Sequence, residues 1–392
     1  DGQPIKTYLF YLSIQKTAMR KLSFEFSRDI YKDGVARCIL PGKIMLEGIV
    51  CWPNKDTLFM RMLGWFLFYN LLLVEIFHAA YVFKNFTNIG EAVSAGTTVT
   101  STMEGLVRIY TMLTKREVIN RILVKVWKQF WPIDVMDPTK QKEAKRQSYI
   151  SIALTSLVLL VSGTCTVFIT SVPYLTNRGL VVKSVFPFDW SKSYVYELIY
   201  IWQHFNEWLV IVAINGFDFF FIALVTICYI QFIVMQQIFR SILTEDSRRQ
   251  RVIIFGKRGE TMTDREMLFE CLEHHNLLTG ICSELEESFN IAILIQFFVS
   301  TTAICAACLV LKLDYSQFTK MMSYVVGHLS QLFYYCLVGQ ELSYQSGHLG
   351  VAIYECNWHL SYDRNFRKAL VLMIQRSQRV QCLTAVGITE LN

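Results

Sequence analysis

The sequence has little charge for its length. Only 18% of its 392 residues are Asp, Glu, Lys or Arg, whereas 53% are hydrophobic. A soluble domain carries about 25% charged residues, so this chain lacks the polar surface that a water-soluble fold requires. The hydrophobic residues also gather into long runs, which is typical of helices that cross a membrane.

The sequence also lacks the motifs of common enzymes. It contains no phosphate-binding glycine loop, no HExxH and no GxSxG. Most of the 11 cysteines lie in apolar runs or in segments predicted to lie inside the cell, and the predicted outer loop 175–205 has none. This distribution argues against a disulfide framework. We predict no enzymatic activity, no cofactor, no metal site and no nucleic-acid partner.

Six apolar runs are each long enough to cross about 30 Å of hydrocarbon. They lie at about 57–83, 88–113, 148–174, 206–236, 289–313 and 317–345. No run has the alternating pattern of an outer-membrane strand, and helices satisfy their own backbone hydrogen bonds in lipid. The sequence therefore predicts an all-α polytopic membrane bundle.

The loops that carry Lys and Arg predict the orientation of the bundle. Of the 38 such residues, 30 fall in the N-terminal segment, in 114–147, in 237–288 and in the C-terminal tail. Only six fall in the loops on the other side of the spans, and two lie near span ends. Basic loops stay in the cytoplasm, so we predict a cytoplasmic N-terminus. The sequon Asn85-Phe86-Thr87 falls in the first predicted outer loop, which makes Asn85 a candidate glycosylation site. An inner N-terminus disfavours a G-protein-coupled receptor.

The spans and loops together predict five segments along the chain. Residues 1–56 form a cytoplasmic N-terminal segment, and 57–236 carry the first four spans, which we expect to sense a ligand. Residues 237–288 form a cytoplasmic helical segment, 289–345 carry the last two spans, and 346–392 contain a cytoplasmic anchor helix.

Polar residues within the spans need partners or water, because ionisable groups are costly in lipid. Glu104 and Arg108 are four residues apart, which predicts a salt bridge within one helix. For Asp218 a hydrogen bond to a neighbouring helix is favoured over a role in a ligand or ion path. His328 and Gln331 are predicted to link helices.

The adjacent histidines His274 and His275 suggest a metal site at first sight. Neighbouring residues on a helix point about 100° apart, so we expect both on a solvated face instead.

Small and hydroxylic residues are frequent in the outer halves of the second to fifth spans. Two interpretations stay open: close helix packing, or a cavity for a small apolar molecule. The candidate cavity residues at helical spacing are Ala92, Ala95, Gly96, Val161, Thr164, Phe168, Ile211, Asn215, Thr301 and Ile304. The aromatic loop 186–190 is either a lid over this cavity or a packed loop.

The last sixty residues carry a distinctive pattern, in which a span leads through an aromatic turn into a basic amphipathic helix. Its residues are Leu332-Phe333-Tyr334-Tyr335-Cys336, Gly339, Ser346, Ala352-Ile353-Tyr354, Trp358, Phe366-Arg367-Lys368-Ala369-Leu370, Ile374 and Arg376-Ser377-Gln378. Their order and spacing resemble the C-terminal signature of insect odorant receptors. Val380 departs from this signature, because the family commonly has proline there.

The resemblance implies a heterotetrameric, non-selective cation channel in the plasma membrane of sensory neuron dendrites. An odour-tuning subunit, which binds a small volatile odorant, would assemble with a co-receptor subunit. The segment 237–288 is shorter than the corresponding loop of the co-receptor, so this chain looks like a tuning subunit. The family's seventh, pore-lining helix is expected beyond Asn392. A gustatory-type receptor of the same topology is the alternative; a transporter is disfavoured, because no inverted repeats are visible.

Overall fold

The computed structural model describes residues 34–53, 57–176, 179–313, 315, 318–385 and 389–390. Nearly all of these residues are helical. The long helices are α3 (Leu58–Lys84), α4 (Ile89–Thr114), α6 (Pro138–Thr176), α7 (Ser193–Ser241), α10 (Asp264–Leu313) and α11 (Phe318–Tyr354). The shorter ones are η2 (Val35–Ile39), α2 (Leu40–Gly48), α5 (Arg116–Gln129), η3 (Ile133–Val135), α8 (Asp246–Phe255), α9 (Lys257–Thr261), η5 (Trp358–Leu360) and α12 (Arg364–Ser377). Two short strands, β1 (Thr384–Ala385) and β2 (Thr389–Glu390), pair in antiparallel fashion.

Each of the six predicted spans overlaps one long helix, and the all-α fold class is confirmed. Among the described residues, α3, α6, α7 and α10 are long and apolar enough to cross a membrane. The helices α4 and α11 are less apolar, because they carry Ser, Thr, His and Gln as well as the buried pair Glu104 and Arg108. Glu104, Arg108 and His328 are buried among the helices.

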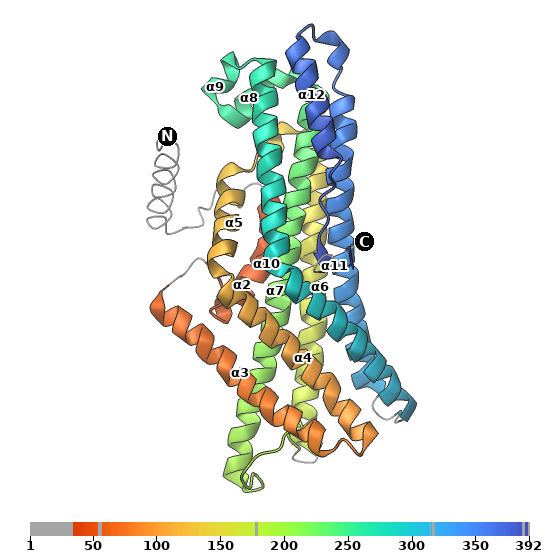
Figure 1. Cartoon of the computed structure of the whole chain (residues 1–392). Coiled ribbons are helices and arrows are strands. Elements are labelled where there is room, and N and C mark those ends of the chain that lie inside the picture. Colours follow the sequence, from red (N-terminus) through yellow and green to blue (C-terminus); the bar gives the residue numbers. More distant parts are fainter. Residues whose placement is uncertain are drawn as a thin grey trace, which may run out of the picture.

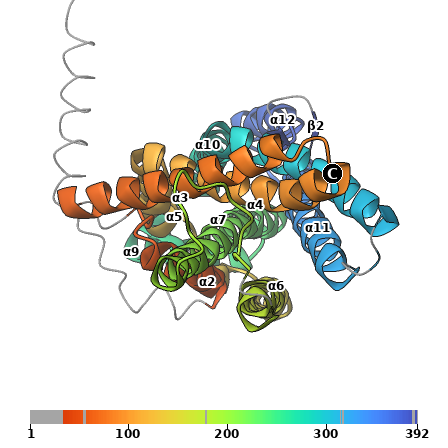
Figure 2. The ribbon, with the colours of Figure 1, turned by 90° about the horizontal axis from the view of Figure 1, so that it is seen from below.

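Helix α7 forms the centre of the bundle (Figures 1 and 2) and packs against α2, α4, α6 and α11. Its stretch from Phe217 to Met235 is almost completely buried. A helix that is apolar on all sides needs neighbours on all sides, which explains its position. The helices α3 and α4 run obliquely to α6, α7 and α11. The short helices α8, α9 and α12 gather at one end of the bundle.

The helices α7 and α10 are much longer than a membrane is thick. With 49 and 50 residues, each spans about 75 Å, against about 30 Å of hydrocarbon. The predicted segment borders at 236, 288 and 345 all fall inside continuous helices. The division into membrane and anchor segments stays a prediction.

The helix α2 packs against the middle of α7, where glycines allow a close approach. A Cβ atom on Gly42 would lie 2.6 Å from the backbone nitrogen of Phe220, and one on Gly216 would lie 3.0 Å from Met45. The Trp52 ring contacts the Phe220 ring edge-on, with 5.4 Å between the ring centroids. Part of the segment that we predicted to be cytoplasmic therefore docks beside residues that we predicted to lie in the membrane.

The prediction of a solvated face for His274 and His275 was wrong, because both side chains are buried. The His274 ring stacks on Trp131 with 4.0 Å between ring centroids and an interplanar angle of 8°. Its Nε2 lies 3.2 Å from Oε1 of Gln231, whose amide nitrogen donates to the Trp131 carbonyl at 2.8 Å. Burial lowers the pKa of His274 to about 3, so the ring is neutral at physiological pH.

Candidate functional site

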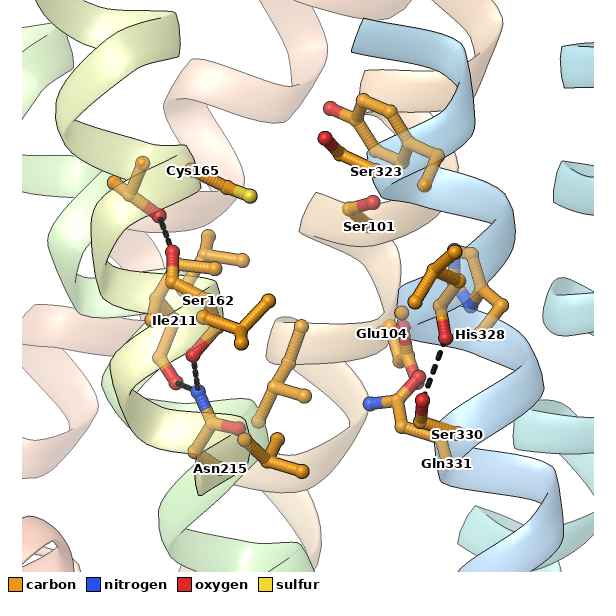
Figure 3. A pocket seen from close by; sticks show the side chains of 18 of the residues that line it. Ser101, Glu104, Ser162, Cys165, Ile211, Asn215, Ser323, His328, Ser330 and Gln331 are labelled. Atoms are coloured by element: carbon orange, nitrogen blue, oxygen red, sulfur yellow. Dashed lines mark hydrogen bonds between the residues drawn. The ribbon is translucent and has the colours of Figure 1, made fainter. Parts of the chain in front are cut away.

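A cavity of about 330 Å³ lies between α4, α6, α7 and α11 (Figure 3). Its walls are mostly apolar, and polar side chains lie on two facing sides. The lining residues are Ser101, Glu104, Leu157, Val158, Val161, Ser162, Cys165, Thr166, Glu207, Val210, Ile211, Ile214, Asn215, Ser323, Tyr324, Val326, Gly327, His328, Ser330, Gln331 and Tyr334. Such a volume suits a small molecule, at the lower end of the range of protein ligand sites.

One polar side of the cavity is formed by Asn215 on α7 and Ser162 on α6 (Figure 3). The Asn215 amide nitrogen donates to the Ser162 hydroxyl at 3.0 Å and to the Ile211 carbonyl at 3.0 Å. Both amide hydrogens are therefore used. The side-chain oxygen of Asn215 is left as a hydrogen-bond acceptor for a ligand.

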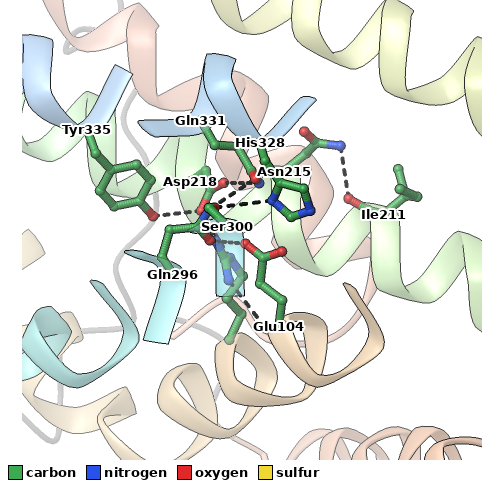
Figure 4. A network of polar contacts seen from close by, with 10 residues as sticks. Glu104, Ile211, Asn215, Asp218, Gln296, Ser300, His328, Gln331 and Tyr335 are labelled. Carbon is green, nitrogen blue, oxygen red and sulfur yellow. Dashed lines mark hydrogen bonds and ion pairs between the residues drawn. The ribbon is translucent and has the colours of Figure 1, made fainter. Parts of the chain in front are cut away.

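The opposite side carries Glu104 from α4 with His328 and Gln331 from α11. These residues also belong to a buried polar network (Figure 4). Its centre is Arg108, which lies 2.9 Å from a Glu104 oxygen and 3.0 Å from Asp218 Oδ1. The predicted salt bridge is confirmed, and the network extends it to α7.

The network connects four helices. Tyr335 donates to Asp218 Oδ1 at 2.7 Å, and the amide of Gln331 donates to Oδ2 at 3.1 Å. From α10, Gln296 accepts a hydrogen bond from Arg108 and donates to Gln331 at 3.0 Å. The predicted hydrogen bonding of Asp218 to a neighbouring helix, and the linking role of Gln331, are thus confirmed.

His328 connects the network to the cavity wall. Its Nδ1 lies 3.2 Å from the hydroxyl of Ser300, which itself accepts from Gln296 at 2.7 Å. His328 is 5% exposed and lines the cavity. The predicted linking role of His328 is confirmed as well.

The structure brings together only some of the predicted cavity residues. Val161, Ile211 and Asn215 line the cavity. Ala92 and Ala95 are buried, and Gly96 is half-buried with no atom within 4 Å of an added Cβ, but none of the three lines it. The side chain of Phe168 lies outside the described part of the structure.

Two exposed threonines among the predicted residues bond to their own helices. Thr164 donates to the Val161 carbonyl at 2.9 Å, and Thr301 donates to the Phe297 carbonyl at 2.8 Å. Ile304, half-buried on α10, does not line the cavity either. All of these positions remain predictions as ligand contacts.

Some of the small residues of α10 pack against other helices: Ser300, Ala303 and Ala307 are buried, whereas Thr301, Thr302 and Cys305 are exposed. Ala307, Val310 and Met321 form a buried cluster with Val93 and Val325 around them. On α4 the cavity is lined only by Ser101 and Glu104, deeper than predicted. Sequence reasoning missed most of its α11 wall, which includes Tyr324 and Tyr334. The recurrence of polar and small residues from 323 to 331 was the available signal.

The aromatic loop packs on the C-terminal half of α3 and the N-terminal end of α7. The Phe186 ring lies 5.1 Å from Phe77, and the Val185 nitrogen donates to the Phe77 carbonyl at 3.1 Å. None of the cavity-lining residues comes from this loop.

The predicted glycosylation site lies just after α3. Asn85 caps the C-terminal end of this helix and donates to the Tyr81 carbonyl at 2.9 Å, and Thr87 is exposed. Glycosylation at Asn85 stays a prediction.

Within the described residues, no cluster of three or more His, Cys, Asp or Glu side chains is arranged to hold a metal ion. Cys305 and Cys308 have the spacing of a CxxC motif on an exposed face of α10, and both are free thiols.

The fold and the cavity define a polytopic helical membrane protein with room for a small molecule among its spans. Residues 88–392 match the family model described as 7tm odorant receptor. The chain belongs to this odorant receptor family, and it is a multi-pass membrane protein.

Curated relatives come from Drosophila melanogaster. The chain is 24% identical to odorant receptor 22c over 70% of this chain and 69% of the relative. It is 21% identical to odorant receptor 85b over 85% of each. These relatives are odorant receptors and not the co-receptor, as predicted for an odour-tuning subunit.

Solved structures show the same fold. The chain matches the insect olfactory receptor OR5 from Machilis hrabei with a TM-score of 0.76 and 14% identity, over 93% of this chain and 92% of that one. The same receptor in complex with eugenol matches with a TM-score of 0.76 and 14% identity, over 90% and 92%.

Proposed function

We propose that this chain is the odour-tuning subunit of a ligand-gated, non-selective cation channel, and that it binds a small volatile molecule in the cavity between α4, α6, α7 and α11. The observation that carries this proposal is the cavity itself, which lies inside a bundle of the odorant receptor family. The complex of the Machilis receptor with eugenol supports the same role for the fold.

The cavity favours an apolar ligand with one hydrogen-bond donor. The polar groups that face each other across it offer acceptors: the Asn215 oxygen on one side and the Glu104 carboxylate on the other. A hydroxyl group can donate to either one, while the remaining apolar walls bury the rest of the molecule. A ligand that lacks a donor leaves the Asn215 oxygen without a partner, which costs about 1–3 kcal/mol, whereas Glu104 keeps its ion pair with Arg108.

Gating requires that the ligand bind the open state more tightly than the closed one. The polar network can connect ligand binding to gating. Glu104, His328 and Gln331 line the cavity, and they are also members of the network. The network reaches Gln296 on α10 and Tyr335 on α11. A ligand that contacts Glu104 or Gln331 therefore acts on α10 and α11, the two last spans.

The channel is proposed to assemble as a heterotetramer with the odorant co-receptor in the plasma membrane, with the N-terminus of this chain in the cytoplasm. The excess of Lys and Arg in the predicted inner segments supports this orientation.

Current recording tests the proposal. The natural full-length chain, co-expressed with a co-receptor, is screened with a panel of volatiles in the presence of a G-protein inhibitor. We expect fast cation currents that persist under the inhibitor. Currents that require G-protein turnover would rule the channel proposal out, and the same cells with the co-receptor alone are the control.

A further inference from the structure

A second cavity continues the first one toward the opposite end of the bundle. It has a volume of about 210 Å³ and lies between the same α6, α7 and α11 helices. Its lining begins where that of the first cavity ends: Leu154 lies one turn before Leu157 on α6, and Ile222 lies two turns after Asn215 on α7. The two cavities therefore occupy one cleft. We call them the outer and the inner chamber.

Tyr334 on α11 lines both chambers, and it is the residue that their linings share. The helix α6 packs mainly along α7 and touches α11 less, and both chambers lie between α6 and α11. Tyr334 is half-buried, and its ring lies against Phe333 with 5.9 Å between centroids. Among the described residues its hydroxyl makes no hydrogen bond, so no polar contact fixes the ring.

The inner chamber has an apolar part that suits an alkyl chain. This part consists of Ile150, Leu154, Ile222, Leu337 and Val338, and the rest of the lining is polar: Gln147, Ser151, Thr155, Thr226, Tyr229 and Glu341. The polar acceptors of the outer chamber lie near Asn215, seven residues from Ile222, which corresponds to about 10 Å along α7. A linear amphiphile can thus place its polar head in the outer chamber and its tail in the inner one.

We infer that Tyr334 sets the length of ligand that the cavity accepts, by closing the outer chamber against the inner one. With the ring in place, a ligand occupies about 330 Å³. Without the ring, the tail of a long-chain alcohol enters the inner chamber. The inference rests on the proposed function, because it assigns the ligand class of the same site.

Photolabelling tests this inference without relying on channel activity. The full chain in lipid vesicles is labelled with 1-hexanol and 1-dodecanol that carry a diazirine at the end of the chain, and the labelled peptides are mapped. Tyr334→Ala is compared with wild type and with Tyr334→Phe, which keeps the ring. A tenfold excess of the unlabelled alcohol separates site labelling from labelling by probe dissolved in the bilayer.

In the wild type and Tyr334→Phe, we expect displaceable label only on outer-chamber peptides around Val161 and Ile211. In Tyr334→Ala, the dodecanol probe is expected to label the peptides around Leu154 and Ile222 as well, and the hexanol probe is not. Because burial of each methylene strengthens binding about fourfold, affinity in this variant should rise with each carbon beyond hexanol. Adding Leu154→Trp, which fills the inner chamber, should restore the wild-type pattern.

Equal inner-chamber labelling with and without the Tyr334 ring would overturn the inference, as would absence of displaceable label from the inner chamber in Tyr334→Ala. Either result leaves the odorant-gated current of the wild-type receptor intact. A receptor that gives no odorant-gated current, yet shows the Tyr334-dependent labelling, would instead contradict the proposed function alone.

Discussion

Arg108 is a buried cation between two buried carboxylates, Glu104 and Asp218. Each charge would be costly alone in this environment, so the three are stable only together. The spacing of Glu104 and Arg108 predicted half of this arrangement. The other half depends on how α4 packs against α7, and no local pattern carries that information.

Removing Arg108 should destabilise the protein strongly. In Arg108→Met the two carboxylates lose their counter-charge, and the expected loss is about 3–5 kcal/mol. It appears as a lower thermal unfolding midpoint of the detergent-solubilised protein. The control is Lys140→Met, because Lys140 pairs with Glu143 on an exposed surface, where the expected change is about 0.5 kcal/mol or less. Equal midpoints for the two variants would contradict a central role for Arg108.

His274 should make stability depend on pH. Its pKa is about 3 in the folded protein and about 6.5 when unfolded, so the unfolded state binds more protons between these values. The contribution of neutral His274 to the free energy of unfolding is fully present above pH 6.5. It falls as the pH decreases toward 3, by about 1.4 kcal/mol for each pH unit. Chemical unfolding at pH 7.5 and 5.5 measures this slope.

The variant His274→Phe keeps an aromatic ring against Trp131 but cannot titrate. It should lose most of the slope, while His275, whose pKa burial also lowers, retains its share. An unchanged slope in His274→Phe would show that other groups cause the pH dependence.

At the scale of helices, the close contact between α2 and α7 depends on Gly42. An added methyl group meets the Phe220 backbone nitrogen at 2.6 Å, and backbone cannot move aside easily. Gly42→Ala should therefore destabilise the protein by about 1–3 kcal/mol. Gly48, at the end of the same helix, has no atom within 4 Å of an added Cβ, so Gly48→Ala should leave the unfolding midpoint nearly unchanged. If both variants lowered the unfolding midpoint strongly, the cause would lie within α2 and not in its contact with α7.

The face that α6 presents to the cavity can be tested with two residues one turn apart. Val161 lines the cavity, whereas Thr164 does not. We expect Val161→Phe to fill part of the cavity and to raise the EC50 of the strongest agonist from the volatile screen at least tenfold. Thr164→Phe should change it less than twofold. The opposite result would place the ligand on the Thr164 face of α6, outside this cavity.

The three candidate residues on α6, Val161, Thr164 and Phe168, came from the same helical spacing, which favours none of them over the others. The small residues of α10 likewise fitted either a cavity or close packing. In the structure Ala307 packs against Met321 and Ala303 is buried, whereas Thr301 and Thr302 are exposed. Composition reveals that helices approach each other closely, but not which pairs do so.

For the whole molecule, the distribution of basic residues predicts which ends of the helices face the cytoplasm. An epitope at the N-terminus should be stained only after cells are permeabilised, whereas one inserted after Ser191, an exposed residue between α6 and α7, should be stained on intact cells. Untagged cells and a cytosolic marker are the controls. Staining of the N-terminal epitope on intact cells would reverse the predicted orientation.

Hydropathy along the chain is enough to predict the membrane helices, because about twenty apolar residues suffice to make a span whatever surrounds them. The sequence also carried the family signature from Leu332 to Gln378 and the local pair of Glu104 with Arg108. Only the tertiary structure decided that Asp218 completes that pair, that His274 is buried against Trp131, and that Tyr334 stands between two chambers. These contacts join residues from different helices, and helix packing, rather than hydropathy or spacing along one helix, brings such residues together.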